Sequence, residues 1–284
     1  MLNYIIFNLI LNICYNVYMA DYVLARKSRN IASSMIHVFL NILLGIGTVL
    51  ITVLSGSPLI GILLVLVSKW RTFAVRSRYF SLSLKANLVD IIVGMSVVLL
   101  AYFGGATFLV SDIILMIFYP IWLLIIKPLS SETATLIQSL IAVFLGMSAA
   151  VVITSGLNSI WLVLVSFLVG YAASRHVLTQ SNDRDFTLTT LVCGLIFAEI
   201  AWLSSTWSIV YTYENFGLSG VIIPQLSIIL TIFAFIYNYA RQAMIKYQDD
   251  FRFVHIAGPI AFGLILVGII IIFFSDPRFT ILLN

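Results

Sequence analysis

Four polar side chains lie inside long apolar stretches of the chain and are its first candidates for chemistry. Glu199 and Asp112 are carboxylic acids, and His37 and Asn41 are spaced four residues apart, which places them on one face of a helix. A charged acid at the centre of a bilayer costs about 2.5–3.5 kcal/mol, so each acid is expected to be protonated, paired or in contact with water. Histidine titrates near neutral pH and can relay protons. The four residues form a candidate intramembrane polar site whose chemistry would be proton transfer.

The acids of this chain differ in their surroundings. Glu199 lies well inside an apolar segment whose neighbours supply no lysine or arginine at its depth, and its alternative role is a hydrogen-bonded, uncharged carboxyl between helices. Asp112 lies nearer the outer surface, so proximity to the interface is the alternative there. Asp90 lies near the inner surface shortly after Lys85, and a local ion pair between these two is the preferred interpretation.

His37 and Asn41 belong to a stripe of small and polar residues that also contains Ser33 and Gly45 and continues loosely through Thr48 and Thr52. Such a stripe must face protein or water rather than lipid. Close packing against other helices is the preferred interpretation, and a hydrophilic pathway is the alternative.

One loop, Lys69–Asn87, is basic and contains no acid. Its basic residues are Lys69, Arg71, Arg76, Arg78 and Lys85. Contact with anionic headgroups would hold such a loop with about 1 kcal/mol per charge. The preferred interpretation is that these residues only fix the orientation of the chain, and specific lipid binding is the minority alternative.

Searches for catalytic and binding motifs return exclusions. The chain has no phosphate-binding GxxxxGK[S/T] loop, and its three histidines, His37, His176 and His255, are scattered, so no cofactor and no metal site are predicted. Cys14 and Cys193 lie in separate apolar stretches and are expected to be buried free thiols. An enzymatic activity is neither indicated nor excluded.

The chain resembles two families of membrane enzymes but lacks the complete catalytic motif of either. Gly217–Gly220 resembles the GxSG motif of rhomboid intramembrane proteases, yet Ser219 and His255 are expected at opposite membrane surfaces. The predicted layout of nine spans, as two four-helix units and a ninth helix, resembles that of UbiA-type prenyltransferases, whose Asp-rich motifs follow the second and sixth helices. Here the first of those loops has no carboxylate, and the second offers only Asn182–Asp185, so no family is assigned.

The composition is that of a membrane protein. Of the 284 residues, 62% are hydrophobic and 9% are charged, whereas soluble domains carry about 25% charged residues. The mean hydropathy is +1.12. The net charge of +4 comes from basic residues between apolar runs rather than on a soluble face, so the predicted partner is the lipid bilayer and not nucleic acid. A homo- or hetero-oligomeric state is left open.

The predicted fold class is an all-α, polytopic transmembrane bundle of about nine spans. Apolar runs place the spans near 31–54, 58–75, 88–104, 107–126, 134–154, 157–174, 187–207, 219–240 and 255–275. The second is the weakest and could be short or re-entrant. In the fifth, Ala142, Gly146 and Ala150 form a small-residue seam that predicts close helix packing.

The basic residues alternate between connections, which predicts an orientation. Of the fifteen, all except Arg278 fall on one side of the membrane, and this side is assigned to the cytoplasm. The predicted location is the cytoplasmic membrane with the C-terminus outside. Residues 1–20 are expected to be retained as a membrane-associated helix, with Asn8, Asn12 and Asn16 in one polar stripe.

Short matches suggest an internal duplication. Ser34–Leu40 resembles Ser139–Leu145, and Leu64–Ser68 recurs unchanged as Leu162–Ser166. Each match pairs a span with the one four spans later, so the two units would have parallel orientation. The alternative is chance similarity, because all spans are built from the same few apolar residue types. The predicted organisation is an N-terminal helix, a first four-span unit, a second four-span unit, and a final loop, span and tail, at 1–30, 31–127, 128–241 and 242–284.

Function is left between three hypotheses. The preferred one is a transporter-like or permease-like protein, with proton coupling through Glu199. The alternatives are a membrane enzyme acting on a lipid-linked substrate at the cytoplasmic face, and a non-catalytic subunit of a membrane complex.

Overall fold

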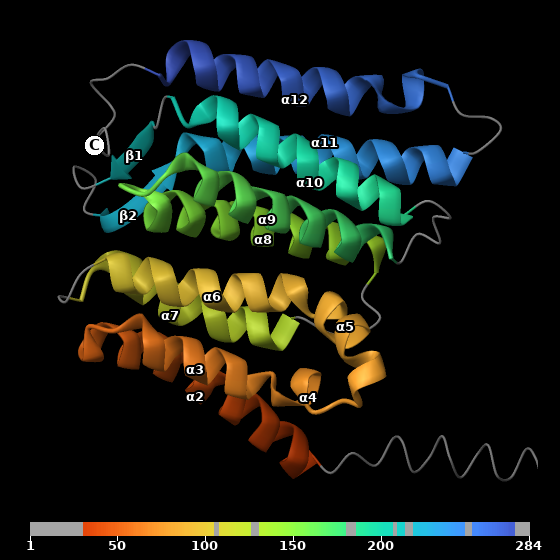
Figure 1. Cartoon of the computed structure of the whole chain (residues 1–284). Coiled ribbons are helices and arrows are strands. Elements are labelled where there is room, and N and C mark those ends of the chain that lie inside the picture. Colours follow the sequence, from red (N-terminus) through yellow and green to blue (C-terminus); the bar gives the residue numbers. More distant parts are fainter. Residues whose placement is uncertain are drawn as a thin grey trace, which may run out of the picture. The chain divides into compact units, whose positions relative to one another are not determined.

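The computed structural model describes residues 31–104, 108–125, 131–179, 186–206, 209–213, 218–247 and 252–275 (Figure 1). The predicted N-terminal helix, its asparagine stripe and Cys14 lie outside them. The described chain is nearly all helical, with helices α2 Ile31–Ser55, α3 Pro58–Ser68, α4 Trp70–Phe73, α5 Ser77–Ala86, α6 Leu88–Phe103, α7 Val110–Ile125, α8 Glu132–Thr154, α9 Ser159–Leu178, α10 Phe186–Ser204, α11 Gln225–Tyr247 and α12 Val254–Phe273. Residues 1–43 and 44–284 are separate compact units, and the packing below concerns the second.

Six of the described helices are long and apolar enough to cross a membrane. They are Met35–Ser55 of α2, and α8, α9, α10, α11 and α12. A seventh span is obtained if Arg78–Ala86 and α6, which meet at a bend of 61°, count as one. The membrane class is therefore supported, but the predicted count of nine spans is not confirmed.

Three predicted spans are short in the structure. Helix α3 has 11 residues, and α6 and α7 have 16 each. At 1.5 Å per residue, 16 residues reach roughly 24 Å, which is less than the roughly 30 Å of a hydrocarbon core. Helix α3 ends where Lys69 begins a basic segment, so the weakest predicted span is indeed short.

A two-stranded hairpin replaces part of the predicted helical structure. Strand β1 (Val210–Tyr213) pairs antiparallel with β2 (Leu218–Pro224), and the register shifts at Thr212/Tyr213. The prediction of an all-α fold with a helix from residue 219 was therefore wrong here. The segments are rich in valine, isoleucine and tyrosine, which favour strands, and they were interpreted as a loop and a span because only hydropathy was considered.

The helical hairpins at the same end of the bundle as β1 and β2 close through capped turns. Ser57 accepts a hydrogen bond from the Leu59 backbone NH, and Asn158 accepts one from Ile160 at 3.0 Å. Gly56 and Gly156 precede these caps with φ of 58° and 81°, a region that glycine enters without a steric penalty. The predicted tight turns at these two places are confirmed. We call this end the hairpin end and the opposite one the α4–α5 end.

Two hydrophobic cores lie side by side. One is built from residues 44–55 of α2 together with α3, α6 and α7, and it includes Val93, Val97 and Tyr119. The other is built from α8, α9, α10 and α11, and it includes Val143 and Phe197. The first core also includes Ala142 of α8, so α8 contributes to both cores. The two four-span units and their relation by an axis along the membrane normal stay predictions.

Helix α8 joins the two cores. It packs against α6, α9 and α11, as Figure 1 shows for the central helices of the bundle. The predicted small-residue seam is buried there: a Cβ on Gly146 would lie 2.9 Å from Ile92 of α6 and 3.2 Å from Val169 of α9. The seam therefore lets three helix backbones approach closely.

The polar stripe of α2 is buried in its second half. Thr48 and Thr52 are fully buried, and their hydroxyls donate to backbone carbonyls of their own helix at 2.7 Å. A Cβ on Gly45 would lie 2.6 Å from the ring of Pro120 on α7. In this half, helix packing, the preferred interpretation, is the one supported.

Candidate functional site

Glu199 does not lie in the interior of the bundle. Its side chain is on the exposed face of α10, in line with the exposed side chains of Leu195 and Trp202. This face would meet lipid or another protein. The interior location that the sequence suggested for Glu199 is therefore not what the structure has, because the buried face of α10 carries Cys193, Phe197 and similar residues instead.

His37 and Asn41 contact each other. The Asn41 side-chain nitrogen lies 3.0 Å from His37 Nδ1 and donates to the His37 backbone carbonyl, also at 3.0 Å. His37 is exposed. The structure therefore gives this pair a local arrangement within α2.

Asp112 is fully buried in the first turn of α7. Its Oδ2 accepts a hydrogen bond from the Leu109 backbone NH at 3.0 Å, which is a helix-capping role. The structure therefore supports a helix-capping role for Asp112 more than the proton-transfer role considered from the sequence. One of its two carboxylate oxygens, Oδ1, has no partner among the described residues.

Asp90 is the carboxylate at the centre of a buried polar group. It forms an ion pair with Lys69, the residue that ends α3, and accepts a hydrogen bond from Trp122 Nε1 of α7 at 3.0 Å. Its side chain is 7% exposed and that of Lys69 is 16% exposed. The predicted local pair with Lys85 was wrong, because the turn of α6 that carries Asp90 faces α3 and α7, whereas Lys85 is exposed.

A second hydrogen-bonded pair joins α8 and α9. His176 of α9 donates from Nε2 to the side-chain oxygen of Gln138 of α8 at 2.9 Å. His176 and Tyr119 of α7 both lie within electrostatic range of the Asp90 carboxylate. We call Lys69, Asp90, Tyr119, Trp122, Gln138 and His176 the polar cluster; it lies toward the α4–α5 end and draws residues from both cores.

Several buried side-chain polar atoms lack hydrogen-bond partners within the described ranges. They include the Tyr119 hydroxyl, the hydroxyl of Ser139 beside Gln138, and both side-chain polar atoms of Asn238 on α11. All three residues are fully buried. An unmet buried hydrogen bond costs about 1–3 kcal/mol, and such groups in native proteins call for a water, an ion or a functional role.

The basic loop is divided by the structure. Lys69 points inward to Asp90 and is not available to a headgroup, whereas Arg76, Arg78 and Lys85 are exposed. Arg78 lies over the ring of Tyr79 at 4.5 Å. For Lys69 the predicted headgroup contact is therefore replaced by a buried ion pair, and for the three exposed residues it stays a prediction. The side chain of Arg71 lies outside the described set.

Among the described residues, the structure does not bring together the acids that a magnesium site of the UbiA type would need. Within the described residues, no three histidine, cysteine or acidic side chains are grouped as metal ligands would be. Asp90 is the carboxylate of the polar cluster, and Asn182–Asp185 lies outside the described ranges. Cys193 is buried and free, as predicted.

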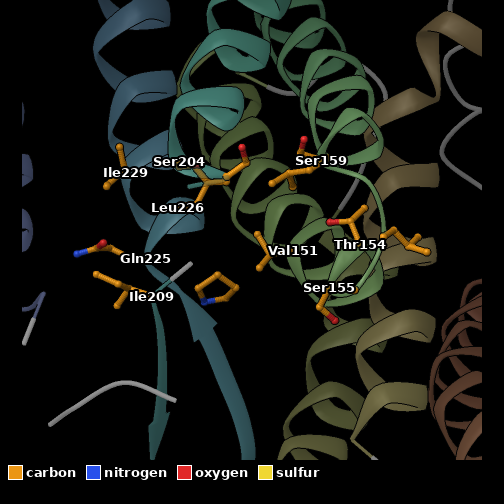
Figure 2. Close-up of a pocket in the computed structure, with 14 residues that line it drawn as sticks. Val151, Thr154, Ser155, Ser159, Ser204, Ile209, Gln225, Leu226 and Ile229 are labelled. Atoms are coloured by element: carbon orange, nitrogen blue, oxygen red, sulfur yellow. The ribbon is translucent and has the colours of Figure 1, made fainter. Parts of the chain in front are cut away.

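A cavity of about 190 Å³ at the hairpin end is lined by hydroxyl groups (Figure 2). The hydroxyls of Thr154 in α8, of Ser155 directly after it and of Ser204 in α10 donate to backbone carbonyls of their own chain segments at 2.6–3.0 Å. Gln225 donates to the Ile270 carbonyl and to Ser275. Because these donors are already engaged, the cavity is less suited to a polar ligand than its residue types suggest.

No family model, no curated protein and no solved structure matches this chain. The fold and the apolar helices are compatible with an integral membrane protein, and this is the class that they define. Any more specific assignment depends on the polar cluster.

Sequence reasoning missed most of that cluster. Gln138 and His176 are polar residues within apolar helices, and this signal was visible in the sequence. Gln138 and His176 lie near helix ends, where an interfacial position is the ordinary explanation for a polar side chain, so their positions in the sequence do not distinguish them.

Proposed function

We propose that this chain is a transporter-like membrane protein whose proton-handling site is the polar cluster rather than Glu199. The observation that carries the proposal is the buried ion pair between Asp90 and Lys69, which lies within electrostatic range of His176. Ionisable residues within membrane bundles are expensive to bury and are functional candidates by default.

The pair has the chemistry of a two-state element. While Asp90 is ionised, it attracts the Lys69 ammonium, and the end of α3 is tied to α6. A proton bound at the Asp90 carboxylate would remove that attraction, leave Lys69 without its counter-charge, and favour separation of α3 from α6. Loss of the proton would restore the pair. His176 offers a titratable group near the same carboxylate, through which a proton could enter or leave.

Proton movement can be measured without knowledge of the cargo. Purified protein would be reconstituted into vesicles containing a pH-sensitive dye, with the membrane potential clamped, and the decay of an imposed pH gradient would be recorded. We expect wild-type protein to accelerate the decay over protein-free vesicles. We expect Asp90→Asn to abolish the acceleration and His176→Gln to reduce it.

Glu199→Gln is the matched control, because it makes the same change of carboxylate to amide at an exposed position. Monodispersity on gel filtration must be equal for all variants, so that loss of fold is not read as loss of flux. Equal flux in wild type and Asp90→Asn would overturn the proposal, and so would wild-type vesicles no leakier than empty ones. Loss of flux in Glu199→Gln alone would return the site to α10.

A second candidate function, a subunit of a membrane complex, is favoured by Glu199 itself. A carboxyl on the exposed face of a membrane helix would be stabilised by a hydrogen-bond donor from a neighbouring protein. In that case, Glu199→Leu would leave the isolated chain intact and shift the migration of the native complex in detergent extracts. Unchanged migration would argue against this function.

The orientation of the site is proposed from the basic loops. We place the α4–α5 end, and with it the polar cluster, at the cytoplasmic side. A cysteine at Arg76, which is exposed at that end, should react with an impermeant thiol reagent only from the cytoplasm. A cysteine at Leu218 in β2 should react only from outside; the opposite pattern would invert the assignment.

A further inference from the structure

An apolar groove runs along the bundle between α7 and α8. It consists of two adjoining cavities of about 250 and 370 Å³, which share Ile114, Leu115, Phe144 and Leu145 as lining residues. It reaches Val152 and β2 at the hairpin end, and Leu140 and Phe118 at its other end. Ile114 is 46% exposed, so the groove opens to the outer surface of the bundle.

The polar residues that line the groove do not offer hydrogen bonds along its length. The Ser148 hydroxyl donates to the Phe144 carbonyl at 2.7 Å, and the Thr231 hydroxyl donates to the Ser227 carbonyl at 2.6 Å. Their polar groups are therefore engaged within their own helices, and the walls presented to a ligand are apolar. A polar solute would lose its hydration in this groove without replacement.

The hairpin end of the groove differs from the rest. The Ser111 hydroxyl, which lines the groove at this end, is buried and has no partner among the residues that the structure describes. Strand β2 lines the groove here and packs closely on the start of α7, because a Cβ on Gly220 would lie 2.5 Å from the side chains of Leu109 and Ser111. The groove thus has apolar walls and one polar end.

The length of the groove fits a lipid chain. From Leu140 to Val152, α8 rises roughly 18 Å, which is more than half of a hydrocarbon core of roughly 30 Å. An extended hydrocarbon chain can lie along such a groove with its methylene groups against the apolar walls.

We propose that this groove binds one acyl chain of a bilayer lipid, drawn from the leaflet at the hairpin end, with the polar head of the lipid at the Ser111 rim. Burial of the chain against Ile114, Phe144 and Leu145 provides the affinity, because methylene groups gain contacts with a packed wall. This site is separate from the polar cluster and does not depend on the proposed proton-handling function.

The test uses a phospholipid with a photoreactive diazirine near the middle of one acyl chain. Full-length protein in vesicles containing this lipid would be irradiated and digested, and the labelled peptides would be quantified by mass spectrometry. We expect labelling to concentrate on the segments that line the groove, 114–118 and 140–148, relative to the exposed helix α12.

Two tryptophan variants make the test specific. Ile114→Trp fills the groove, and we expect it to lower labelling of 140–148 about tenfold, which corresponds to a loss of about 1.4 kcal/mol of binding free energy. Ile117→Trp is the matched control on the same helix, because Ile117 is 60% exposed and does not line either cavity. Labelling of the groove no stronger than that of α12, or an equal loss in both variants, would overturn the proposal. Proton flux is not part of the readout, so failure here leaves the proposed function standing.

Discussion

Asp90 and Glu199 are two carboxylates within apolar helices, and they have opposite surroundings. Asp90 lies at the start of α6, almost fully buried, and its carboxylate binds the Lys69 ammonium and the Trp122 side-chain NH. Glu199 lies in the second half of α10 on a face made of exposed apolar side chains. The position of an acid along a predicted span therefore does not reveal whether it has partners within the protein. That depends on the helix face that carries the acid and on the helices packed against that face.

The comparison also separates two kinds of role. A buried, paired acid contributes to stability and can switch between protonation states, whereas an exposed acid in a membrane contributes to stability only when another molecule covers it. Each of the following experiments challenges one side of this contrast.

The largest loss in free energy of unfolding is expected from Asp90→Ala. It leaves the Lys69 ammonium buried without its counter-charge, and breaking a buried pair from one side costs about 3 kcal/mol or more. Reversible unfolding in mixed micelles would measure the loss. Glu199→Ala is the control; an equal loss of stability in both variants would erase the contrast between the two acids.

A smaller loss is expected from Trp122→Phe. It removes the Nε1 donor from Asp90 but keeps the ion pair with Lys69 and most of the ring. A hydrogen bond to a charged group contributes about 1.5 kcal/mol, so the free energy of unfolding should fall by about that amount. Combining this change with Asp90→Ala should give much less than the sum of the single effects. Full additivity would mean that the two side chains do not interact.

A loss of about 1 kcal/mol is expected from Gln138→Leu. It deprives the His176 Nε2 proton of its acceptor in a buried setting. Thermal denaturation of this variant beside Gln138→Glu, which retains an acceptor oxygen, would measure it. Gln138→Glu at least as destabilised as Gln138→Leu would argue against the hydrogen bond.

The smallest change in free energy of unfolding is expected from Glu199→Leu. Substitutions at exposed positions usually change stability by less than about 0.5 kcal/mol, and leucine suits a lipid-facing position better than glutamate does. Unfolding of the isolated protein should be nearly unchanged, with insertion into membranes equal or improved. A loss comparable to that of Asp90→Ala would show that Glu199 has a partner within the chain.

The sequence predicted the helices of the fold more completely than it predicted the residues of the polar cluster. Apolar runs locate the helices because each must bury backbone polar groups within itself, and turn residues such as Gly56 and Gly156 mark their ends. The hairpin was missed because a strand of valine and isoleucine has the hydropathy of a span. The pairing of Asp90 with Lys69 could not be found by looking for neighbours in sequence, since it depends on how α3 lies against α6.

Partial success with α2 illustrates the same limit. The stripe through Gly45, Thr48 and Thr52 predicted a face toward protein, and these residues are buried. His37 belongs to the same stripe but is exposed. Periodicity identifies a face of a helix, whereas the extent of the neighbouring helices decides how much of that face is covered.

The attachment of the last helix has a mechanical consequence. Helix α12 packs chiefly against α11, where Gly263 lies against Ile236, and its far end is held to the hairpin region by hydrogen bonds from Tyr211 and Gln225 to the carbonyls of Phe274 and Ile270. A pulling force applied at the C-terminus would load these few polar contacts before it reached either core. Under tension, α12 should therefore detach first, as a separate early step in a force-extension curve, while the two cores remain folded.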